Sequence, residues 1–267
     1  MNELQGLNYI DGNGFYKGTI ENNFYNEKTD EYVIDYKSPK LYYYVLKMNK
    51  DEYESFKYYA LVKSDRYNII KSKNITDLYH FSPIENIDSI LKCGLCSRDF
   101  AKLVGVNVIF TDQNRYDGEL NKISASISFP NYKMKYSLEL HENFKFVIFS
   151  VNPRILLAKL DTQFYHTNAA NAIFSNINKK ALTTNEAFLG MFDQYNRDPF
   201  IPDNYTTDPQ AEVLIDTCIP SSYIEKVIVN EDNIEIEDLC EQKKLVYKKD
   251  INLNRGRQDW RRWQNGN

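Results

Sequence analysis

The sequence predicts an α+β protein in which a small β-rich N-terminal domain precedes a mixed core. Residues 1–73 hold 12 of the 21 tyrosines, in segments that also contain valine and are separated by Asn-, Asp- and Gly-containing turns. Aromatic and β-branched residues between such turns are typical of strands. From residue 74 to about 230, strand patterns and helix patterns alternate. We therefore expect a β-rich domain at 1–73, a mixed α+β domain at 74–235 and a C-terminal tail at 236–267.

The N-terminal domain is predicted to be built almost entirely of strands. Only a helical turn is expected in it, near residues 51–54. The segments that we interpret as its strands are FYKGTI (15–20), EYVIDY (31–36), KLYYYVLKM (40–48) and KYYALVK (57–63).

A helix is predicted over residues 83–93. Ser82 has the character of an N-cap, Pro83 suits the first helical position, and Glu85 lies at capping-box spacing from Ser82. Gly94 can adopt the positive φ that ends a helix. The free amides at the N-terminal end of this helix suit an anion or a polar ligand. His80 and Ser82 lie at that end.

The remaining predicted elements of the core are short. A long Pro-, Asp- and Asn-rich loop is expected at 192–210. A loop of that length inside a compact domain is often functional. Helices are expected at about 153–159 and 168–176, with a short turn after Pro220. Strands are expected at NVIF (107–110), ISASISF (123–129), FKFVIFSV (144–151), AEVLI (211–215) and KVIV (226–229).

The composition is that of a soluble globular protein, with 42% hydrophobic and 26% charged residues among 267. No apolar run is long enough for a membrane span, and the first residues lack the basic and apolar regions of a signal peptide. Four cysteines make no disulfide framework in a chain of this length, so we expect a cytoplasmic protein. The net charge is −4, but residues 241–267 carry 8 basic and 3 acidic residues.

Several common sites are excluded by their missing motifs. The sequence contains no GxxxxGK[ST] phosphate loop, no GxGxxG and no HExxH. Cys93 and Cys96 form a CxxC, but no second pair follows to complete a zinc site. The motif ends the predicted helix instead of starting one, so the dipole would not acidify its thiol. We predict local packing for these cysteines and no metal site.

Glu212 is the candidate catalytic carboxylate. In the strand 211–215, Glu212 and Leu214 share one face, and Ala211, Val213 and Ile215 share the other. A solvated glutamate on an edge strand is the alternative. The long polar loop that precedes Glu212 favours a functional role, because a carboxylate placed there can meet a target that the loop holds.

Two segments resemble the DarT family of DNA ADP-ribosyltransferases. The first comprises His80, Glu85-Asn86, Ile90-Leu91, Gly94-Leu95 and Ser97-Arg98; the second comprises Gln210 to Ile215, Ile219-Pro220 and Ile224 to Val229. Arg115, the strand 123–129 and Met134 lie between them, so the order His, Arg, Glu is kept. The segment SISFPNYKMKY departs from the aromatic strand of the family. The resemblance covers about residues 76–230.

This resemblance implies an ADP-ribosyltransferase fold with a split β core and short helices, and NAD as co-substrate. The catalytic residues would be Glu212, Arg115 and His80. Glu212 would stabilise positive charge at the ribose carbon or take a proton from the attacking base. Arg115 would pair with phosphate oxygens. The implied NAD-binding residues are His80, Ser82, Asn86, Gly94, Leu95, Ser97, Arg98 and Arg115.

The resemblance also implies a base in single-stranded DNA as the target, and RNA for some relatives. The basic tail could bind phosphates and stack bases, or it could be a disordered segment or a docked helix. The N-terminal tyrosines could stack bases too, although tyrosines more often pack sheet faces. The expected substrate-binding residues are Met134, Tyr136, Tyr205, Gln210, Arg257, Trp260, Arg261 and Trp263.

The sequence thus predicts a toxin-type, NAD-dependent ADP-ribosyltransferase that modifies single-stranded DNA or RNA. A role in phage defence, a cognate antitoxin as partner and no membrane association are part of this prediction. One alternative is the same chemistry on a protein or a small molecule. Another is a nucleic-acid-binding module without catalytic activity.

Overall fold

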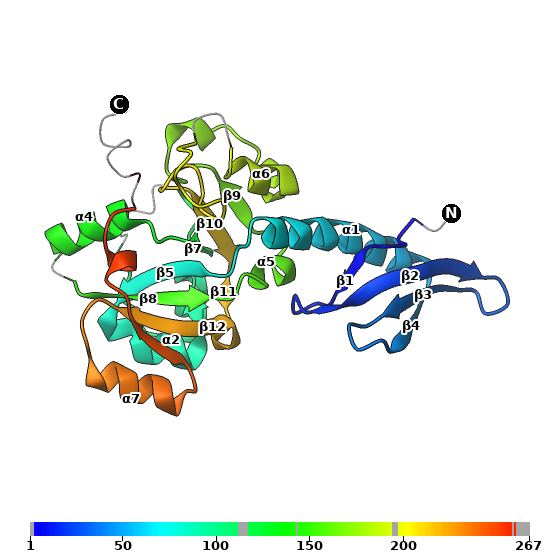
Figure 1. Cartoon of the computed structure of the whole chain (residues 1–267), viewed down its shortest axis with the longest axis horizontal. Coiled ribbons are helices and arrows are strands. Elements are labelled where there is room, and N and C mark those ends of the chain that lie inside the picture. The colour runs from blue at the N-terminus through cyan, green and yellow to red at the C-terminus, as the bar shows by residue number, and fades with distance from the viewer. Residues whose placement is uncertain (1–2, 112–116, 143, 194–196, 258, 260–267) are drawn as a thin grey trace. The chain divides into compact units, whose positions relative to one another are not determined.

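The computed structural model describes residues 3–111, 117–142, 144–193, 197–257 and 259 (Figure 1). The chain divides into two compact units. The N-terminal unit comprises residues 1–72 and 154–160, and the C-terminal unit comprises residues 73–153 and 161–267. Among the described residues, no helix has both the length and the apolar composition of a membrane span.

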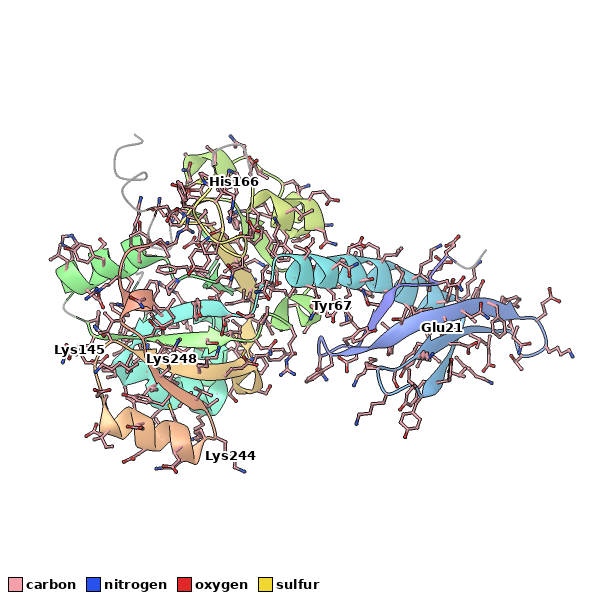
Figure 2. All side chains as sticks on the ribbon, viewed as in Figure 1. Glu21, Tyr67, Lys145, His166, Lys244 and Lys248 are labelled. Atoms are coloured by element: carbon pink, nitrogen blue, oxygen red, sulfur yellow. The ribbon has the colours of Figure 1, made fainter. Side chains whose placement is uncertain are left out.

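The N-terminal unit contains a four-stranded antiparallel sheet and two helices. Its small core includes Leu4, Ile20, Ile34 and Tyr53. Tyr67, labelled in Figure 2, stacks on Tyr16 with ring centroids 5.4 Å apart. The strand order is β1 (Asn8–Ile10), β2 (Tyr16–Asn26), β3 (Glu31–Lys37), β4 (Tyr43–Met48), and the helices are α1 (Lys50–Ser72) and α5 (Ile155–Ala158).

The prediction of a strand at 57–63 and of a single helical turn at 51–54 is wrong. These residues belong to α1, one continuous helix of 23 residues. The backbone N–H of Asn49 donates to Glu52 Oε2 at 2.9 Å, and the N–H of Glu52 donates to Asn49 Oδ1 at 3.0 Å. This reciprocal capping box starts the helix. Its buried face includes Tyr53, Ala60 and Ser64, a helical spacing that the high strand propensity of tyrosine obscures.

The C-terminal unit is built on a mixed seven-stranded sheet, which confirms the predicted α+β class. All neighbouring strands are antiparallel except β12 and β13, which are parallel. A separate two-stranded ribbon joins β6 (Leu95–Cys96) and β11 (Cys218–Ile219). The order of the large sheet is β13 (Val246–Lys249), β12 (Ile224–Val229), β8 (Phe146–Val151), β5 (Leu78–Pro83), β7 (Lys122–Ile127), β10 (Glu212–Asp216), β9 (Gln163–Tyr165).

Four of the five strands predicted for this unit are present, as β7, β8, β10 and β12. The fifth, at 107–110, is wrong, because these residues form no ladder with another strand. The backbone N–H of Ile109 instead donates to Asn86 Oδ1, and Asn86 Nδ2 donates to the Ile109 carbonyl, each at 2.8 Å. A single side-chain amide therefore takes the place of a neighbouring strand.

The helix predicted at 83–93 is present in part. A 3₁₀ turn, η1 (Ile84–Asn86), leads into α2 (Ile87–Cys93). The expected capping box is wrong, because Ser82 and Pro83 belong to β5 and pair with β8, and neither η1 nor α2 has a side-chain cap. Gly94 ends the helix as predicted, with φ +86° and its N–H bonded to the Ile90 carbonyl at 2.8 Å.

The other helices of the C-terminal unit are short, and most were not predicted. The helix expected at 168–176 is only the 3₁₀ turn η2, while the turn after Pro220 is present as η4. The helix expected at 153–159 corresponds to α5 of the N-terminal unit. The C-terminal unit contains α3 (Arg98–Val104), α4 (Tyr132–Glu142), α6 (Asn185–Gly190), α7 (Ile234–Gln242), η2 (Ala172–Phe174), η3 (Lys179–Thr183), η4 (Ser221–Tyr223) and η5 (Asn252–Asn254).

Part of the predicted C-terminal tail belongs to the sheet. The tail was placed at 236–267, but α7 leads into β13, which pairs with β12 and becomes the last strand of the sheet. Arg257 lies farther along and is only 2% exposed. The folded part of the C-terminal unit therefore continues well past residue 236.

Candidate active site

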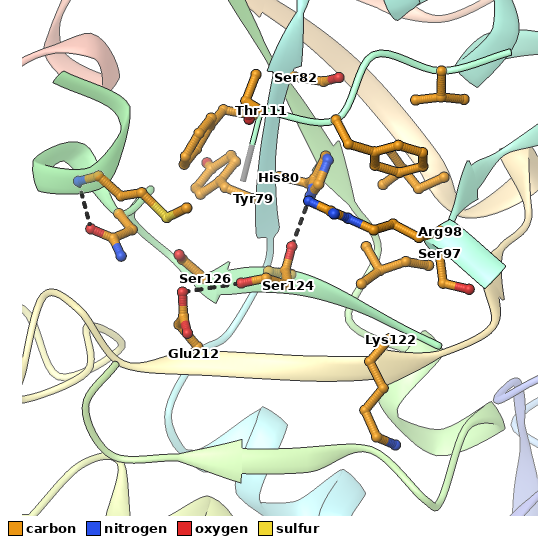
Figure 3. A pocket seen from close by; sticks show the side chains of 18 of the residues that line it. Tyr79, His80, Ser82, Ser97, Arg98, Thr111, Lys122, Ser124, Ser126 and Glu212 are labelled. Atoms are coloured by element: carbon orange, nitrogen blue, oxygen red, sulfur yellow. Dashed lines mark hydrogen bonds between the residues drawn. The ribbon is translucent and has the colours of Figure 1, made fainter. Parts of the chain in front are cut away.

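A cavity of about 330 Å³ lies in the C-terminal unit (Figure 3). Its walls come from β5, β7, the first residue of β10, the segment around β6 and the loop at 108–111. Of the residues predicted to bind or react, seven line it: His80, Ser82, Leu95, Ser97, Arg98, Met134 and Glu212. Segments far apart in the sequence are thus brought to one site.

Glu212 is buried and is fixed at both carboxylate oxygens. The residue is only 6% exposed. Oε1 accepts a hydrogen bond from Ser124 Oγ at 3.2 Å (Figure 3). Oε2 accepts one from the backbone N–H of Ala169 at 2.9 Å. The strand β10 lies between β7 and β9, so Glu212 is not the solvated edge-strand residue of the alternative interpretation.

His80 is held on β5 by the same residue of β7 that contacts Glu212. Its Nδ1 lies 2.8 Å from the carbonyl oxygen of Ser124. Because a carbonyl oxygen only accepts, Nδ1 carries the hydrogen, and Nε2 of the neutral ring is then an acceptor. The imidazole is therefore held in one orientation at the cavity wall.

Asn86 acts behind the cavity wall. It is 2% exposed and does not line the cavity. Its Nδ2 donates to Ser82 Oγ at 3.0 Å and to the Ile109 carbonyl. Asn86 therefore positions Ser82 and the 108–111 wall, and the predicted direct contact of Asn86 with NAD is not supported by its place in the structure.

The segment after α2 places Leu95, Ser97 and Arg98 on the cavity. Gly94 itself does not line it, but a Cβ on Gly94 would lie 2.3 Å from the Ile219 carbonyl oxygen. The glycine is therefore needed where this segment approaches β11. Ser97 Oγ accepts from the N–H of Phe100 and caps α3, and the Arg98 guanidinium lies 5.3 Å from the centre of the Phe110 ring.

Several expected substrate residues lie away from the cavity. Tyr136 is on α4 and is 65% exposed, and Gln210 is held by the Asp208 carboxylate through its backbone N–H. Tyr205 packs against Phe129, with ring centroids 5.5 Å apart. None of the three lines the cavity.

Arg257 is an internal residue, so its predicted contact with nucleic acid is wrong. It pairs with Asp259, and the side chains of both partners are 1% exposed. Its Nη1 donates to the Thr206 carbonyl at 2.8 Å and its Nη2 to the Thr207 carbonyl at 3.3 Å. A guanidinium enclosed in this way anchors the loop at 206–207 and is not presented at the surface of the described part of the chain.

Four predicted residues lie outside the described part of the chain. They are Arg115, Trp260, Arg261 and Trp263.

The polar residues of β7 are functional candidates that sequence reasoning missed. Lys122, Ser124 and Ser126 alternate along the strand and line the cavity, as do Asn131 and Asn168 from the adjoining loops. The Lys122 ammonium pairs with Asp216 on β10. The period of two in the segment KISASI could have identified this face, because residues i, i+2 and i+4 of a strand point the same way.

The cysteines behave as packing residues where the structure describes them. Cys96 and Cys218 face each other across the β6–β11 ribbon. Burial, with the neighbouring Cys218 as a further cause, raises the pKa of Cys96 to about 12. The thiol is therefore protonated at neutral pH. Among the described residues, no three His, Cys, Asp or Glu side chains come together as a metal site.

His166, which is labelled in Figure 2, is exposed. It is not among the residues that line the cavity. Its ring packs against Phe174 at 5.2 Å between centroids. His166 therefore packs at the surface of the C-terminal unit.

Solved structures to which the chain is similar come from two organisms. DarTG of Thermosipho africanus in complex with ADP-ribose is 16% identical, with a TM-score of 0.47 over 67% of this chain and 51% of that chain. The chain therefore spans about half the length of the Thermosipho protein. DarT of Thermus sp. 2.9 in complex with NAD+ is 13% identical, with a TM-score of 0.43 over 67% of this chain and 98% of that chain.

A second Thermus sp. 2.9 structure, DarT in complex with ADP-ribosylated ssDNA, is also 13% identical, with a TM-score of 0.45 over 68% of this chain and 97% of that chain. No curated protein sequence matches the chain significantly. A family model described as "ssDNA thymidine ADP-ribosyltransferase, DarT" matches residues 79–254, which include His80 and Glu212. Because this match covers more than half of the sequence, the chain belongs to the DarT family of ssDNA thymidine ADP-ribosyltransferases.

Proposed function

We propose that the protein transfers ADP-ribose from NAD to a base in single-stranded DNA. The observation that carries this proposal is the buried Glu212 carboxylate, which two hydrogen bonds fix at the wall of a cavity that also contains His80. A carboxylate that is desolvated and cannot rotate is suited to stabilising positive charge that develops opposite it. The family match over residues 79–254 assigns such a reaction to the family.

The cavity lining fits the polar groups of NAD. His80 offers an imidazole acceptor, Ser82 and Ser97 offer hydroxyls, and Arg98 offers a guanidinium that can pair with phosphate oxygens. Leu95 and Phe110 add apolar surface for a ring. We assign the NAD-binding role to these residues. Arg115 keeps the catalytic role that the resemblance implies, as a prediction.

Glu212 would act at the ribose carbon that loses nicotinamide. Its negative charge stabilises the positive charge that builds up as that bond breaks, and it can accept the proton of the attacking base nitrogen. The two hydrogen-bond donors, Ser124 Oγ and the Ala169 N–H, hold the carboxylate in place for both roles. His80 would orient the sugar through Nε2.

Single-stranded DNA is the favoured target because an unpaired base enters a cavity without the cost of unstacking a duplex. RNA and protein acceptors are outcomes that the experiment separates from DNA. Expression as a toxin, neutralisation by a cognate antitoxin and a part in phage defence stay predictions from the family resemblance.

The test uses the full chain, NAD labelled on its adenylate, and parallel single-stranded DNA, RNA and protein mixtures. Label is expected on DNA and absent for Glu212→Ala. Label on RNA or on protein instead would show that RNA or protein, and not DNA, is the acceptor. No label in any mixture, together with no measurable NAD binding, would contradict transferase activity and favour a nucleic-acid-binding module.

A further inference from the structure

The turn between β7 and α4 combines two features that the roles assigned above do not explain. Ser128 has φ +58°, a left-handed conformation that is strained for a residue with a Cβ. Asn131 is only 3% exposed, lines the cavity, and its Nδ2 has no hydrogen-bond partner among the described residues. Strain and unsatisfied buried groups both concentrate at ligand sites.

The orientation of the Asn131 amide is fixed by its neighbours. The backbone N–H of Met134 donates to Asn131 Oδ1 at 3.2 Å, at the start of α4. An N–H needs an acceptor, so the oxygen must be the end that faces Met134, and Nδ2 is the end that remains. A buried NH₂ group without an acceptor is unfavourable, and a hydrogen bond to a ligand oxygen would remove this penalty.

Asn131 lies on the opposite side of Glu212 from Ser97 and Arg98. The segment before β7 is next to α3, because the N–H of Asp99 donates to the Leu120 carbonyl at 3.3 Å. The middle of β7 contacts the reaction centre, since Ser124 binds both His80 and Glu212. Asn131 follows the far end of β7. The cavity therefore has a Ser97–Arg98 end and an Asn131 end, with Glu212 between them.

We infer that Asn131 is a base-recognition residue, which donates a hydrogen bond from Nδ2 to a carbonyl oxygen of the acceptor base. This inference rests on the proposed function, in which the Ser97–Arg98 end holds NAD. An acceptor that attacks at Glu212 must then approach from the other end, where Asn131 lies. A neutral amide donor suits a neutral carbonyl oxygen, whereas phosphates are bound more strongly by cations.

The assignment makes a chemical distinction among bases. Thymine, cytosine and guanine carry a carbonyl oxygen, and adenine carries none. A site that hydrogen-bonds one group of its substrate discriminates against an analogue without that group, because the buried donor stays unpaired. The Asn131 end of the cavity should therefore accept a carbonyl base in preference to adenine.

Asn131→Asp and Asn131→Ser test this inference without removing the helix cap. Both side chains keep an oxygen that can accept from Met134, but neither has the amide donor. The serine variant is neutral, which separates loss of the donor from repulsion of the DNA by a new charge. Asn178→Asp is the matched control, because Asn178 also caps a helix with Oδ1, from an exposed site outside the cavity.

The assay measures NAD affinity and transfer to four oligonucleotides: three that place a single T, C or G among adenines, and one of adenines alone. We expect wild type and Asn178→Asp to label a carbonyl base in preference to adenine. For both Asn131 variants we expect kcat/KM toward that base to fall about tenfold or more. Their affinity for NAD should stay within twofold of wild type.

Three results would overturn the assignment. Unchanged base preference in both variants would leave Asn131 as a helix cap alone. Weaker NAD binding with unchanged base preference would place Asn131 on the NAD side. A wild-type preference for adenine would exclude carbonyl recognition. A wild-type protein that neither binds NAD nor transfers label would instead contradict the proposed function itself.

Discussion

Ser124 donates its hydroxyl to Glu212 across two adjacent antiparallel strands, at 3.2 Å. The backbone carbonyl of the same serine accepts from His80 on the strand at its other side, at 2.8 Å. One residue of β7 thus sets the positions of both candidate reactive groups. Since β7 is an inner strand of the sheet, with β5 on one side and β10 on the other, the two groups are held by a strand that is paired along both edges.

Replacing Glu212 by Gln should abolish most of the transfer activity without unfolding the protein. The amide oxygen can still accept from the Ala169 N–H, so the shape of the site is kept, but the charge that stabilises the reacting centre is lost. We expect kcat to fall about 100-fold or more, with NAD affinity nearly unchanged. Glu225→Gln is the control, because Glu225 binds Asn152 outside the cavity. A Glu212→Gln enzyme with more than a tenth of the wild-type rate would exclude this role.

His80→Asn separates the two ring nitrogens. The Asn side chain can place Nδ2 near the position of Nδ1 and keep the bond to the Ser124 carbonyl, while the acceptor at Nε2 is lost. We expect KM for NAD to rise about tenfold, the cost of one hydrogen bond, with little change in melting temperature. His166→Asn, at an exposed site, should leave KM unchanged. An equal effect of both substitutions would argue against a contact between His80 and NAD.

The strands of the core were predictable where the residues themselves decide the structure. β8 is buried along its whole length, and its continuous apolar run identifies it. The strand wrongly expected at 107–110 has a similar run, but the distant Asn86 side chain occupies its backbone groups. The basic tail sequence predicts that Arg257 binds phosphates, but in the structure Asp259 and two loop carbonyls enclose it. Partners remote in sequence decide such cases, and no local pattern reveals them.

Glu212, the polar residues of β7 and Asn131 differ in how strongly the sequence indicates them. Glu212 follows a long polar loop and lies in an otherwise apolar strand, which is a local signal. The polar face of β7 gives a weaker signal, because alternating serines are equally typical of a solvated strand. Asn131 has no sequence signature, because only the folded structure shows that its Nδ2 is buried without a hydrogen-bond partner among the described residues.

Gly94→Ala should destabilise the C-terminal unit. The backbone of Gly94 has φ +86°, and an added Cβ would lie 2.3 Å from the Ile219 carbonyl oxygen. Strain of this kind costs about 1–3 kcal/mol before the clash is counted. We expect a lower urea midpoint and weaker NAD binding, because Leu95 and Ser97 would shift. Gly190→Ala is the control, since a Cβ there meets nothing within 4 Å, and it should be neutral or slightly stabilising. Equal midpoints for the two variants would refute the packing argument.

Asp77 should make the stability of the C-terminal unit depend on acid pH. Burial acts to raise the pKa of Asp77, but hydrogen bonds from Lys226, Ser150 and Thr76 outweigh it, and the pKa lies below its ordinary value of 3.8. A lowered folded-state pKa means that the unfolded chain binds the proton more readily. The stabilisation is therefore fully present above about pH 4 and is lost as the pH falls through the folded-state pKa.

Asp77→Asn tests this dependence, because it removes the charge but keeps the size of the side chain. Asp77 Oδ1 lies 2.5 Å from both Lys226 Nζ and Ser150 Oγ, so at pH 7 we expect a loss of about 3 kcal/mol in the free energy of unfolding. The difference from wild type should shrink in urea titrations at pH 3. Asp232→Asn removes an exposed partner of Lys249 and should cost about 0.5 kcal/mol at most. A difference between wild type and Asp77→Asn that is the same at pH 7 and pH 3 would show that the charge of Asp77 contributes nothing.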